Sequence, residues 1–511
     1  MLAVYFGFLL LFPCLSLCNN PGLKVQITRK GIDYGFQLGI EAVKKMIQNM
    51  NPPVFTGQVG PIKFTISGLR VLHPSYSESS MSLVPPTGLH LSLQDVTFTL
   101  QGNWRINFAG INPHGSADIF VSRLSISSSV GLTRDSAGRP KMQSNSCQTT
   151  ISSTIVGESM DKLIQASLQN VVEELINKNL CMEMNKLIER LNTYLTTMEV
   201  STQFGQYVEL QYGLVGQPLI REDYIDLNFK GSFRSTRNHT EPPFSPDQLE
   251  MTKLCNQTQK MLCIGISEYF FNSAAYASFM AGALSLDIAD NMIPHISHLR
   301  LTTDILALFI PEIMASYTSA PILLHLSVHE PPQFAIEQDT LLLMLSATMQ
   351  IFAVLPNSSK EQLIHMRLQA TFTIGLRVSG QKICGYISDS NFHFILTNIF
   401  IGSYQCNRVL WEMNPANQEV SYCTPEGKSH TKPVNEQIKL TSLCKQISDR
   451  HLAAVKMIMS QASDAIIIPT INEKLNEGFP LPIIDNIKFM NSSLKSYQGF
   501  FLIATDVEFL S

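Results

Sequence analysis

Long stretches of the chain alternate between apolar and polar residues, which is the pattern of β-strands with one buried face. The stretches are 62–72, 89–101, 117–132, 365–380 and 388–402. In one of them the alternation slips at Gln94 and Asp95 and then resumes, which indicates a bulge. Because several stretches are longer than an average strand, we predict a strongly bent antiparallel sheet in each half of the chain.

A few other segments carry the period of an amphipathic helix. Within 34–50, Phe36, Ile40 and Val43 fall on one face, and Asp33 is positioned to cap the helix. The other predicted helices lie within 158–195, from about 248 onward, and over roughly 446–477. Each half of the chain therefore combines many strands with a helix at each end.

The first residues have the composition of a secretory leader. Residues 2–12 are almost all apolar, which suits a signal-peptide core and is too short to cross a bilayer, and small side chains follow at Ser16 and Cys18. We expect a signal peptide over 1–18 and a secreted, extracellular mature chain. A membrane anchor is the alternative, because no Lys or Arg precedes the apolar run. The longest later apolar run, 341–355, contains polar residues and is predicted to be a buried strand.

Composition agrees with an extracellular protein. Removal of the leader would leave eight of the ten cysteines, an even number. Charged residues make up only 15% of the chain and apolar residues 45%, which predicts either large cores or apolar surfaces that line a cavity. The net charge is −4 and no basic block is present, so nucleic acid is not an expected partner. Sequons for N-glycosylation stand at Asn238, Asn256, Asn357 and Asn491.

The length predicts two modules, because about 490 mature residues exceed what one hydrophobic core usually supports. A polar, Pro-rich stretch separates the two halves. We place an N-terminal module over 19–231, a linker over 232–252 and a C-terminal module over 253–511.

Several motifs are spread over nearly the whole mature chain, namely "NPGLKVQITRKGIDYG", "GNWRI", "FFNSAAYASFMAGALSLDIADNMIP", "INEKLNEGFPLP" and "LKSYQGFFLIATDVEFL". Together they resemble the bactericidal/permeability-increasing and lipopolysaccharide-binding protein family. The resemblance implies an α+β fold, a boomerang-shaped pair of curled antiparallel β-barrels, each closed by long helices and joined by a central sheet and the Pro-rich linker. Relative to the family, a segment near 403–435 looks inserted.

The resemblance also implies that each module holds the acyl chains of about one phospholipid, or of a related two-chain lipid, between its barrel and its helices. Any apolar residue on a helix face can instead pack against protein, but the low charge content and the resemblance together favour pockets. The candidate lipid-binding residues are Phe36, Ile40, Val43, Leu163, Ile164, Leu168 and Val171. No cofactor is expected beyond this bound lipid, and contact with membrane surfaces is expected to be transient.

In the family a disulfide ties a strand to the long helix, and Cys147 and Cys181 stand at the matching places. The pairing of the other cysteines stays open; they are Cys255, Cys263, Cys384, Cys406, Cys423 and Cys444. Cys255 and Cys263 fall on an expected helix, where a separation of eight residues is too great for a bond between them. A bond between Cys406 and Cys423 would staple the inserted segment.

The sequence contains no motif of nucleophilic, zinc-dependent or nucleotide-dependent catalysis, so we do not expect an enzyme. His325 and His329 share a strand face, and His295 and His298 are close in sequence, but neither pair has an evident third ligand. We therefore expect no metal site.

Two functions remain. The first is lipid binding by a secreted protein, with roles in lipid transfer and innate immunity. The second is charge-driven recognition of bacterial lipopolysaccharide. The family's recognition of lipopolysaccharide uses lysines at the tip of the N-terminal barrel, whereas residues 88–110 here contain one basic residue, Arg105. Residues 19–232 carry 18 Lys and Arg against 17 Asp and Glu, a net charge of +1. We therefore expect lipid binding as the main function and weak binding of lipopolysaccharide.

Overall fold

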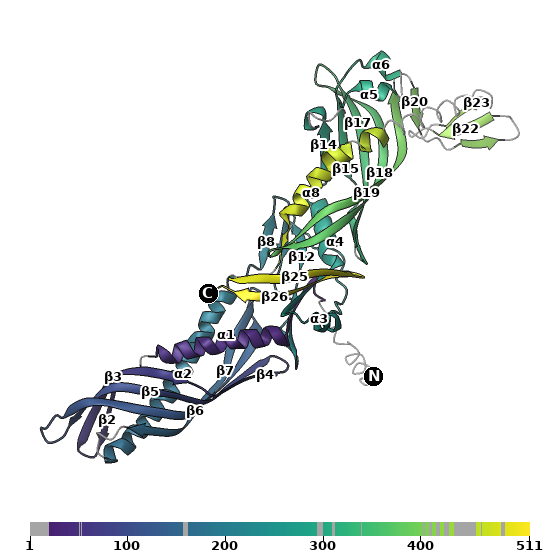
Figure 1. The fold of residues 1–511 in the computed structure, drawn as a ribbon. Coiled ribbons are helices and arrows are strands. Elements are labelled where there is room, and N and C mark those ends of the chain that lie inside the picture. The colour runs from purple at the N-terminus through teal and green to yellow at the C-terminus, as the bar shows by residue number, and fades with distance from the viewer. Residues whose placement is uncertain are drawn as a thin grey trace, which may run out of the picture.

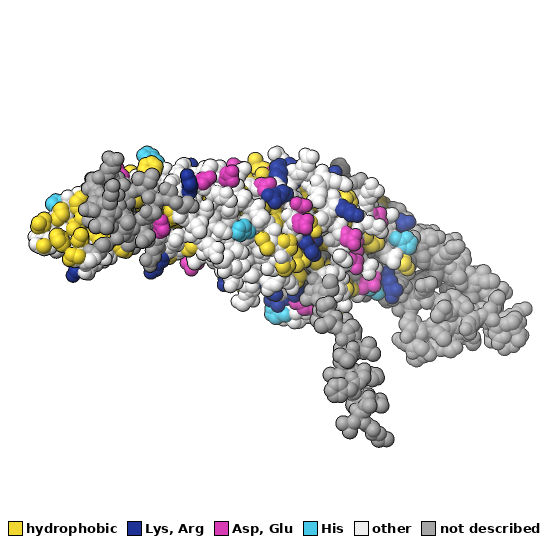
Figure 2. Space-filling view, turned by 90° about the horizontal axis from the view of Figure 1, so that it is seen from below, with side chains coloured by type: hydrophobic (Ala, Val, Ile, Leu, Met, Phe, Trp, Pro, Cys, Tyr) yellow, Lys and Arg dark blue, Asp and Glu magenta, His cyan; other side chains and the backbone are white. Residues whose placement is uncertain are grey.

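The protein is elongated, with a curled sheet at each end and a central sheet between them, as the computed structural model shows (Figure 1). The structure describes 20–50, 52, 54–156, 162–293, 300–308, 312–338, 340–401, 456–460, 462–481 and 486–510, with four short strands between 404 and 433. Charged side chains of both signs are interspersed on the face shown in Figure 2. Among the described helices, none combines the length and the apolar character that crossing a membrane requires.

The central sheet joins the two modules through β1 and β13. Its strands follow the order β10 (Leu219–Ile220), β11 (Tyr224–Phe229), β1 (Leu23–Thr28), β13 (Leu262–Ser267), β26 (Phe500–Phe509) and β25 (Ile487–Tyr497). β1 and β13 pair antiparallel, and each leads directly into a helix, α1 (Arg29–Gln48) and α4 (Glu268–Met280). The two modules thus begin in the same way on either side of the β1–β13 boundary.

The N-terminal sheet is a curled antiparallel sheet covered by α1 and by α2 (Lys162–Leu195) (Figure 1). Its strands are β2 (Phe55–Val59), β3 (Ile62–Ser75), β5 (Gly88–Asn107), β6 (His114–Arg134) and β7 (Pro140–Val156), with β4 (Glu78–Val84) paired to β5. The predicted bulge is confirmed, because the β5–β6 register shifts between Leu93 and Val96 and Asp95 has a left-handed backbone (φ 51°).

The C-terminal sheet repeats this design. Its strands are β14 (Ser285–Ala289), β15 (Ile322–Val328), β17 (Thr340–Val354), β18 (Lys360–Ser379), β19 (Lys382–Ile401) and β20 (Tyr404–Asn407), with β16 (Gln333–Glu337) on β17 and β24 (Phe479–Pro480) on β19. The described helices of this module besides α4 include α3 (Thr252–Thr258), a 3-10 turn (Asp290–Met292), α5 (Thr303–Ala307), α6 (Glu312–Ser316), a π-helical turn (Ser463–Ile467) and α8 (Ile468–Glu477), and residues 456–460 are helical as well. The long alternating stretches of both halves are confirmed as strands, and so is the apolar run 341–355.

Strands occur in the two segments that were expected to be a linker and an insertion. The linker expected over 232–252 begins with a strand, β12 (Ser232–Ser235), which forms a small sheet with β9 (Val208–Gln211) and β8 (Ser201–Phe204). The segment expected to be inserted contains a separate three-stranded sheet of β21 (Trp411–Asn414), β22 (Glu419–Cys423) and β23 (Ser429–Pro433).

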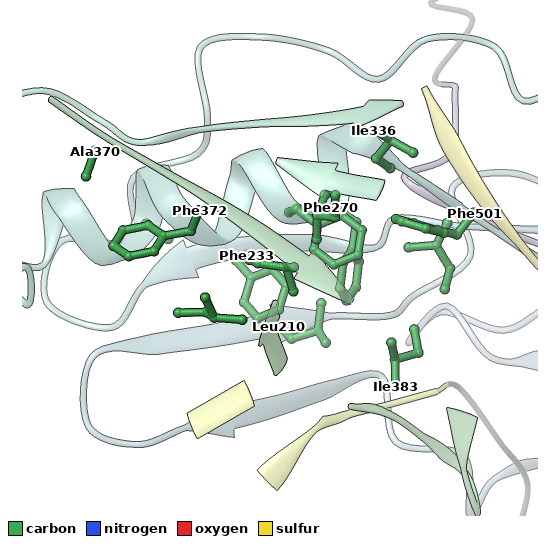
Figure 3. Packing of buried hydrophobic residues seen from close by; sticks show 14 of the residues in the cluster. Leu210, Phe233, Phe270, Ile336, Ala370, Phe372, Ile383 and Phe501 are labelled. Carbon is green, nitrogen blue, oxygen red and sulfur yellow. The ribbon is translucent and has the colours of Figure 1, made fainter. Parts of the chain in front are cut away.

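A phenylalanine cluster packs the small β8–β9–β12 sheet against the C-terminal module (Figure 3). Phe233 on β12 contacts Phe270 on α4 edge to face, with 5.1 Å between ring centroids, and both rings are almost fully buried. Phe479 contacts both rings. The backbone N–H of Phe233 also donates to Ser273 Oγ on α4 at 3.1 Å.

Sequence analysis fails in three places, namely the start of α1, the whole of α4 and the end of α3. α1 begins at Arg29, where the Thr28 side chain accepts from Gly31 N, so Asp33 is not the cap but lies inside the helix and pairs with Arg29 at 2.9 Å. α4 was not predicted, because Glu268–Met280 is apolar on nearly all sides and has no clear helical stripe.

The third failure concerns Cys255 and Cys263, which form a disulfide. The helix that carries Cys255 ends at Thr258, and Gln259 follows in a left-handed conformation (φ 53°). The chain therefore reverses, and Cys263 returns on β13 with its Cα 5.9 Å from that of Cys255.

Candidate functional site

α1 separates two apolar cavities. The helix buries Ile32, Ile40, Val43 and Ile47 along one stripe. Next to this stripe runs a row of glycines, Gly31, Gly35 and Gly39, which are spaced four residues apart and therefore lie one above another. At Gly35 and Gly39 the missing side chains leave room beside the helix, whereas at Gly31 the backbone of Met261 approaches so closely that a Cβ atom would lie 2.4 Å from its carbonyl oxygen.

The first cavity lies between α1, α2 and the concave face of the N-terminal sheet, and its volume is about 280 Å³. From the helices it is lined by Phe36, Ile40, Val43, Met184, Leu187, Ile188 and Leu191, and from the strands by Met81, Leu89, Leu91, Leu93, Ile126, Val130, Met142 and Ile225. The inward side chains of this sheet thus line a cavity in addition to packing a core.

The second cavity lies between α1 and the central sheet, and its volume is about 260 Å³. Its lining comes from segments far apart in the sequence, which are Val25, Ile27, Tyr34, Leu38, Pro140, Met198, Leu227, Phe229, Met261, Leu262, Ile487, Phe489, Val507 and Phe509. This cavity therefore exists only once both modules have contributed to the central sheet.

The two cavities share one wall, because Ile27, Gly31 and Gly35 line both. A Cβ atom built at Gly35 or at Gly39 would meet no atom within 4 Å. Together the cavities reach the range of roughly 300–1,000 Å³ typical of sites for small molecules.

The cavities are almost free of polar groups. Among the described residues that line the two cavities, none has a charged side chain. The polar side chains present are Ser92 and Ser128 in the first cavity and Tyr34 in the second, and the Tyr34 hydroxyl accepts from Phe509 N at 3.1 Å. Such a lining favours hydrocarbon and disfavours charged or strongly hydrated ligands.

Charged groups gather instead near the start of α1. Lys30 on α1 and Lys260 before β13 both bind Asp506 on β26, at 2.9 and 2.8 Å. Burial opposes ionisation of Asp506, but the hydrogen bonds and charges of Lys260 and Lys30 outweigh it and lower the pKa of the carboxyl. These ion pairs hold the first turn of α1 to the strand that lines the second cavity.

Exposed apolar side chains stand at the edges of both cavities. Leu38 and Phe509 line the second cavity and Leu191 the first, yet each is more than a third exposed. Tyr194 on α2 contacts Phe509 edge to face at 6.2 Å. The cavities therefore open toward solvent through an apolar rim.

A larger open groove of about 1380 Å³ lies elsewhere, between the linker, α4 and the β25–β26 turn. Its lining mixes aromatic rings with charged side chains, among them Asp247, Glu268, Glu337 and Lys495. This groove is larger than the two cavities beside α1, but its charged lining does not suit the acyl chains of a lipid.

Phe36, Ile40 and Val43 from the predicted set line the first cavity. Leu163, Ile164, Leu168 and Val171 lie early in α2, where the side chains are outside the described part of the structure. Among the described side chains of α2, Met184, Leu187, Ile188 and Leu191 line the cavity. These residues continue the same apolar stripe along α2, so hydrophobic periodicity could have identified them. The glycine row and the second cavity could not be identified in this way, because neither produces a periodic pattern of apolar residues.

The remaining predicted sites are placed as follows. Cys147 on β7 and Cys181 on α2 form a disulfide, the pair that the resemblance implies. Cys384 is buried and free, and the side chains of Cys406, Cys423 and Cys444 lie outside the described residues. The four sequon asparagines, Asn238, Asn256, Asn357 and Asn491, are all exposed, as acceptors of a glycan must be.

The histidines singled out in the sequence do not combine with each other in the described part of the chain. His325 pairs with Asp287 on the neighbouring strand at 2.5 Å, and His329 is exposed. His295 and His298 lie outside the described residues. No cluster of three His, Cys, Asp or Glu side chains suited to a metal ion occurs among the residues that the structure describes.

Comparison with known proteins identifies relatives over almost the whole chain. Residues 31–195 match the N-terminal domain and residues 202–509 the C-terminal domain of the LBP / BPI / CETP family. The second match begins within β8, and β8, β9 and β12 pack on the C-terminal module.

The chain is 27% identical to a bactericidal permeability-increasing protein of Sebastes schlegelii over 97% of both chains. It is 27% identical to the human BPI fold-containing family C protein, over 96% of this chain and 89% of that one, and 25% identical to human lipopolysaccharide-binding protein, over 97% and 95%. The crystal structure of a lipopolysaccharide binding protein superposes with a TM-score of 0.59 at 20% identity, over 96% of this chain and 100% of that one. The fold is therefore the two-module boomerang that the motifs implied.

Proposed function

The chain belongs to the LBP / BPI / CETP family, and from this premise we propose that it is a secreted protein that holds the acyl chains of a phospholipid, or of a related two-chain lipid, in the two cavities beside α1. Members of this family bind lipids and are not enzymes. The relatives of this chain within the family are secreted proteins of innate immunity. That the bound lipid has two acyl chains, and that the protein transfers it between surfaces, are both parts of this proposal.

The observation that carries the proposal is the pair of uncharged cavities with a shared wall. Each methylene moved from water into such a cavity contributes about 0.8 kcal/mol, so two acyl chains supply ample affinity. Two adjoining cavities suit a ligand with two chains, one on each side of the glycine row. The exposed apolar rim would then let the lipid enter and leave while its polar headgroup stays in water.

Filling the shared wall tests the proposal. Replacing Gly35→Leu together with Gly39→Leu places side chains into open space at the wall and mouth of the cavities. The helix itself should gain stability, because leucine is a better helix former than glycine by roughly 0.5–1 kcal/mol per residue. Displacing three or four methylenes of lipid should lower lipid affinity by about 2–3 kcal/mol, or roughly 30- to 150-fold.

The measurement is organic extraction of protein secreted from cells, followed by mass spectrometry of the lipids per molecule. Gln37→Leu is the matched control, since Gln37 is exposed on the same helix and lines neither cavity. The unaltered protein and the control should carry two-chain lipid, while the double variant carries far less and melts no earlier. Equal lipid content in all three proteins would reject this site. Extraction of about two lipids per molecule would support a second site in the C-terminal module.

Recognition of lipopolysaccharide is the second candidate, and the likeness to human lipopolysaccharide-binding protein favours it. Lipopolysaccharide also carries acyl chains that the cavities suit. The near-neutral N-terminal module opposes a charge-driven mode of binding, because residues 19–232 carry a net charge of only +1.

A further inference from the structure

The large groove between the linker, α4 and the β25–β26 turn is separate from the cavities that the proposed function uses. α4 and the end of β25 lie side by side in the middle of the molecule, and Glu268 N at the start of α4 donates to Gly499 O in the turn (Figure 1). The volume of the groove, about 1380 Å³, exceeds the range of roughly 300–1,000 Å³ typical of sites for small molecules. A groove of this size suits a segment of polypeptide.

The walls of the groove are tied to one another. Asn272 on α4 binds the backbone of β16, because its Nδ2 donates to Phe334 O at 3.0 Å and its Oδ1 accepts from Phe334 N at 2.7 Å. Glu268 Oε2 accepts from Ile336 N at 2.9 Å, and Gly499 N donates to Ile336 O at 3.2 Å. The groove is therefore formed before any ligand arrives, which lowers the entropic cost of binding.

Carboxylates outnumber cations in the lining of this groove. The lining contains Asp247, Glu250, Glu268 and Glu337 but a single basic side chain, Lys495, which gives a net charge of −3. In the described part of the chain, no ion pair neutralises Asp247, Glu250 or Glu337, and all three are exposed. Because both the linker and β16 present such carboxylates, the groove attracts a ligand with several positive charges.

Aromatic rings stand beside these carboxylates. Tyr497 and Phe500 stack across the β25–β26 turn with 5.3 Å between ring centroids. On the linker, Phe244 is 39% exposed and contacts Tyr269 of α4 edge to face at 5.6 Å. A guanidinium group stacks on such rings and pairs with a carboxylate through two hydrogen bonds, whereas an ammonium group is a compact, strongly hydrated point charge. The lining therefore favours arginine over lysine.

We propose that this groove binds an arginine-rich segment of a partner protein. Guanidinium groups of the segment pair with Asp247, Glu250 and Glu337, and the neighbouring rings cover the planar faces of these groups. The proposal does not rest on lipid binding, because the groove and the cavities beside α1 share no lining residue.

The test is isothermal titration calorimetry of the full chain with a blocked hexapeptide that alternates arginine and leucine. Replacing Asp247→Asn, Glu250→Gln and Glu337→Gln together should weaken binding about tenfold, because three ion pairs are lost. Glu268 is left in place, since its carboxylate holds β16. The three replaced side chains are exposed, so this groove variant should melt with the unaltered protein.

A matched control separates the groove from the overall charge of the protein. The control variant carries Glu78→Gln, Glu189→Gln and Glu222→Gln, which change the net charge equally at exposed positions outside the groove. It should bind the peptide as the unaltered protein does. A peptide with citrulline in place of arginine keeps the shape of the side chain without its charge and should not bind detectably.

The aromatic rings have a readout of their own. A lysine–leucine peptide should bind the unaltered protein about fivefold more weakly than the arginine–leucine peptide, and Tyr497→Leu should abolish this difference. The cavity variant Gly35→Leu with Gly39→Leu should bind the peptide normally, which separates this proposal from that of lipid binding.

Three results would overturn the proposal. The first is equal affinity of the groove variant and the unaltered protein for the arginine peptide, and the second is an equal loss of affinity in the control variant. The third is full displacement of the peptide by tetramethylammonium, which would assign the groove to a small ammonium ligand instead of a protein segment.

Discussion

At the scale of single residues, Asp506 links three parts of the molecule. Its two carboxylate oxygens bind Lys30 on α1 and Lys260 at the start of β13, and Asp506 itself stands on β26. Asp506 and Lys260 are 19% and 22% exposed, whereas Lys30 is 52% exposed and more strongly screened by water. The carboxylate therefore holds the first turn of α1 against the central sheet, next to Val507 in the second cavity.

Replacing Asp506→Asn should lower the free energy of unfolding by about 1 kcal/mol at neutral pH, because both ion pairs are lost. The pKa of Asp506 is lowered in the fold, so its stabilisation is present above the ordinary carboxyl pKa and is lost as pH falls through the lowered value. The difference between variant and unaltered protein, measured by urea unfolding, should hence shrink below about pH 4.

Glu508→Gln provides the control for Asp506, since Glu508 lies on the same strand and is exposed. Its substitution should change stability little at any pH. If the Asp506→Asn variant stayed less stable than the unaltered protein by the same free energy of unfolding in acid, then shape or packing, and not charge, would explain the role of Asp506.

Individual residues also show what sequence could and could not reveal. Phe36, Ile40 and Val43 were predicted to face the cavity because their spacing places them on one side of a helix. Gly35 was missed because a missing side chain gives no hydrophobic signal. Asp33 and Cys255 were misjudged for one shared reason, that the true helix ends lie four or more residues away from those expected.

At the scale of elements, α2 closes the N-terminal module and is fixed to β7 by the Cys147–Cys181 disulfide. Thr149 on β7 also hydrogen-bonds Asn177 on α2, and Ile176, Leu180 and Met184 are buried beneath the helix. The strands and the long helices could be predicted from periodicity, because one face of each is buried. α4 could not, because its sequence is mostly apolar and shows no clear helical stripe.

Removing the α2 disulfide by Cys147→Ser with Cys181→Ser should destabilise the protein by about 4 kcal/mol, because it closes a long loop in the unfolded chain. Cys255→Ser with Cys263→Ser removes a disulfide of separation 8 instead of 34 and should cost about 2–3 kcal/mol. Chemical unfolding without reductant measures both. If the short-loop variant proved the less stable of the two, loop closure would not be the main source of the stabilisation.

At the scale of the whole molecule, the two modules meet through a sheet whose halves correspond across β1 and β13. The second cavity depends on this junction, since its lining combines β1 and β11 with β25 and β26. No local sequence pattern could have predicted it, because its residues converge only in the folded chain. The N-terminal module carries little net charge, and exposed apolar and cationic side chains lie together at its tip.

Binding to lipopolysaccharide should be weak and insensitive to salt in this protein. Each Lys or Arg near an anionic surface contributes on the order of 1 kcal/mol, and the described tip offers Lys63 and Arg105, so acyl-chain burial must supply most of the affinity. Titration of the protein against lipopolysaccharide at low and high salt tests this expectation. A matched variant with Asn107→Lys and Asn112→Lys, two exposed tip positions, should bind roughly tenfold or more tightly at low salt and lose that gain at high salt. Tight binding by the unaltered chain that collapses as salt rises would instead reveal a basic site and make recognition of lipopolysaccharide the better account of its function.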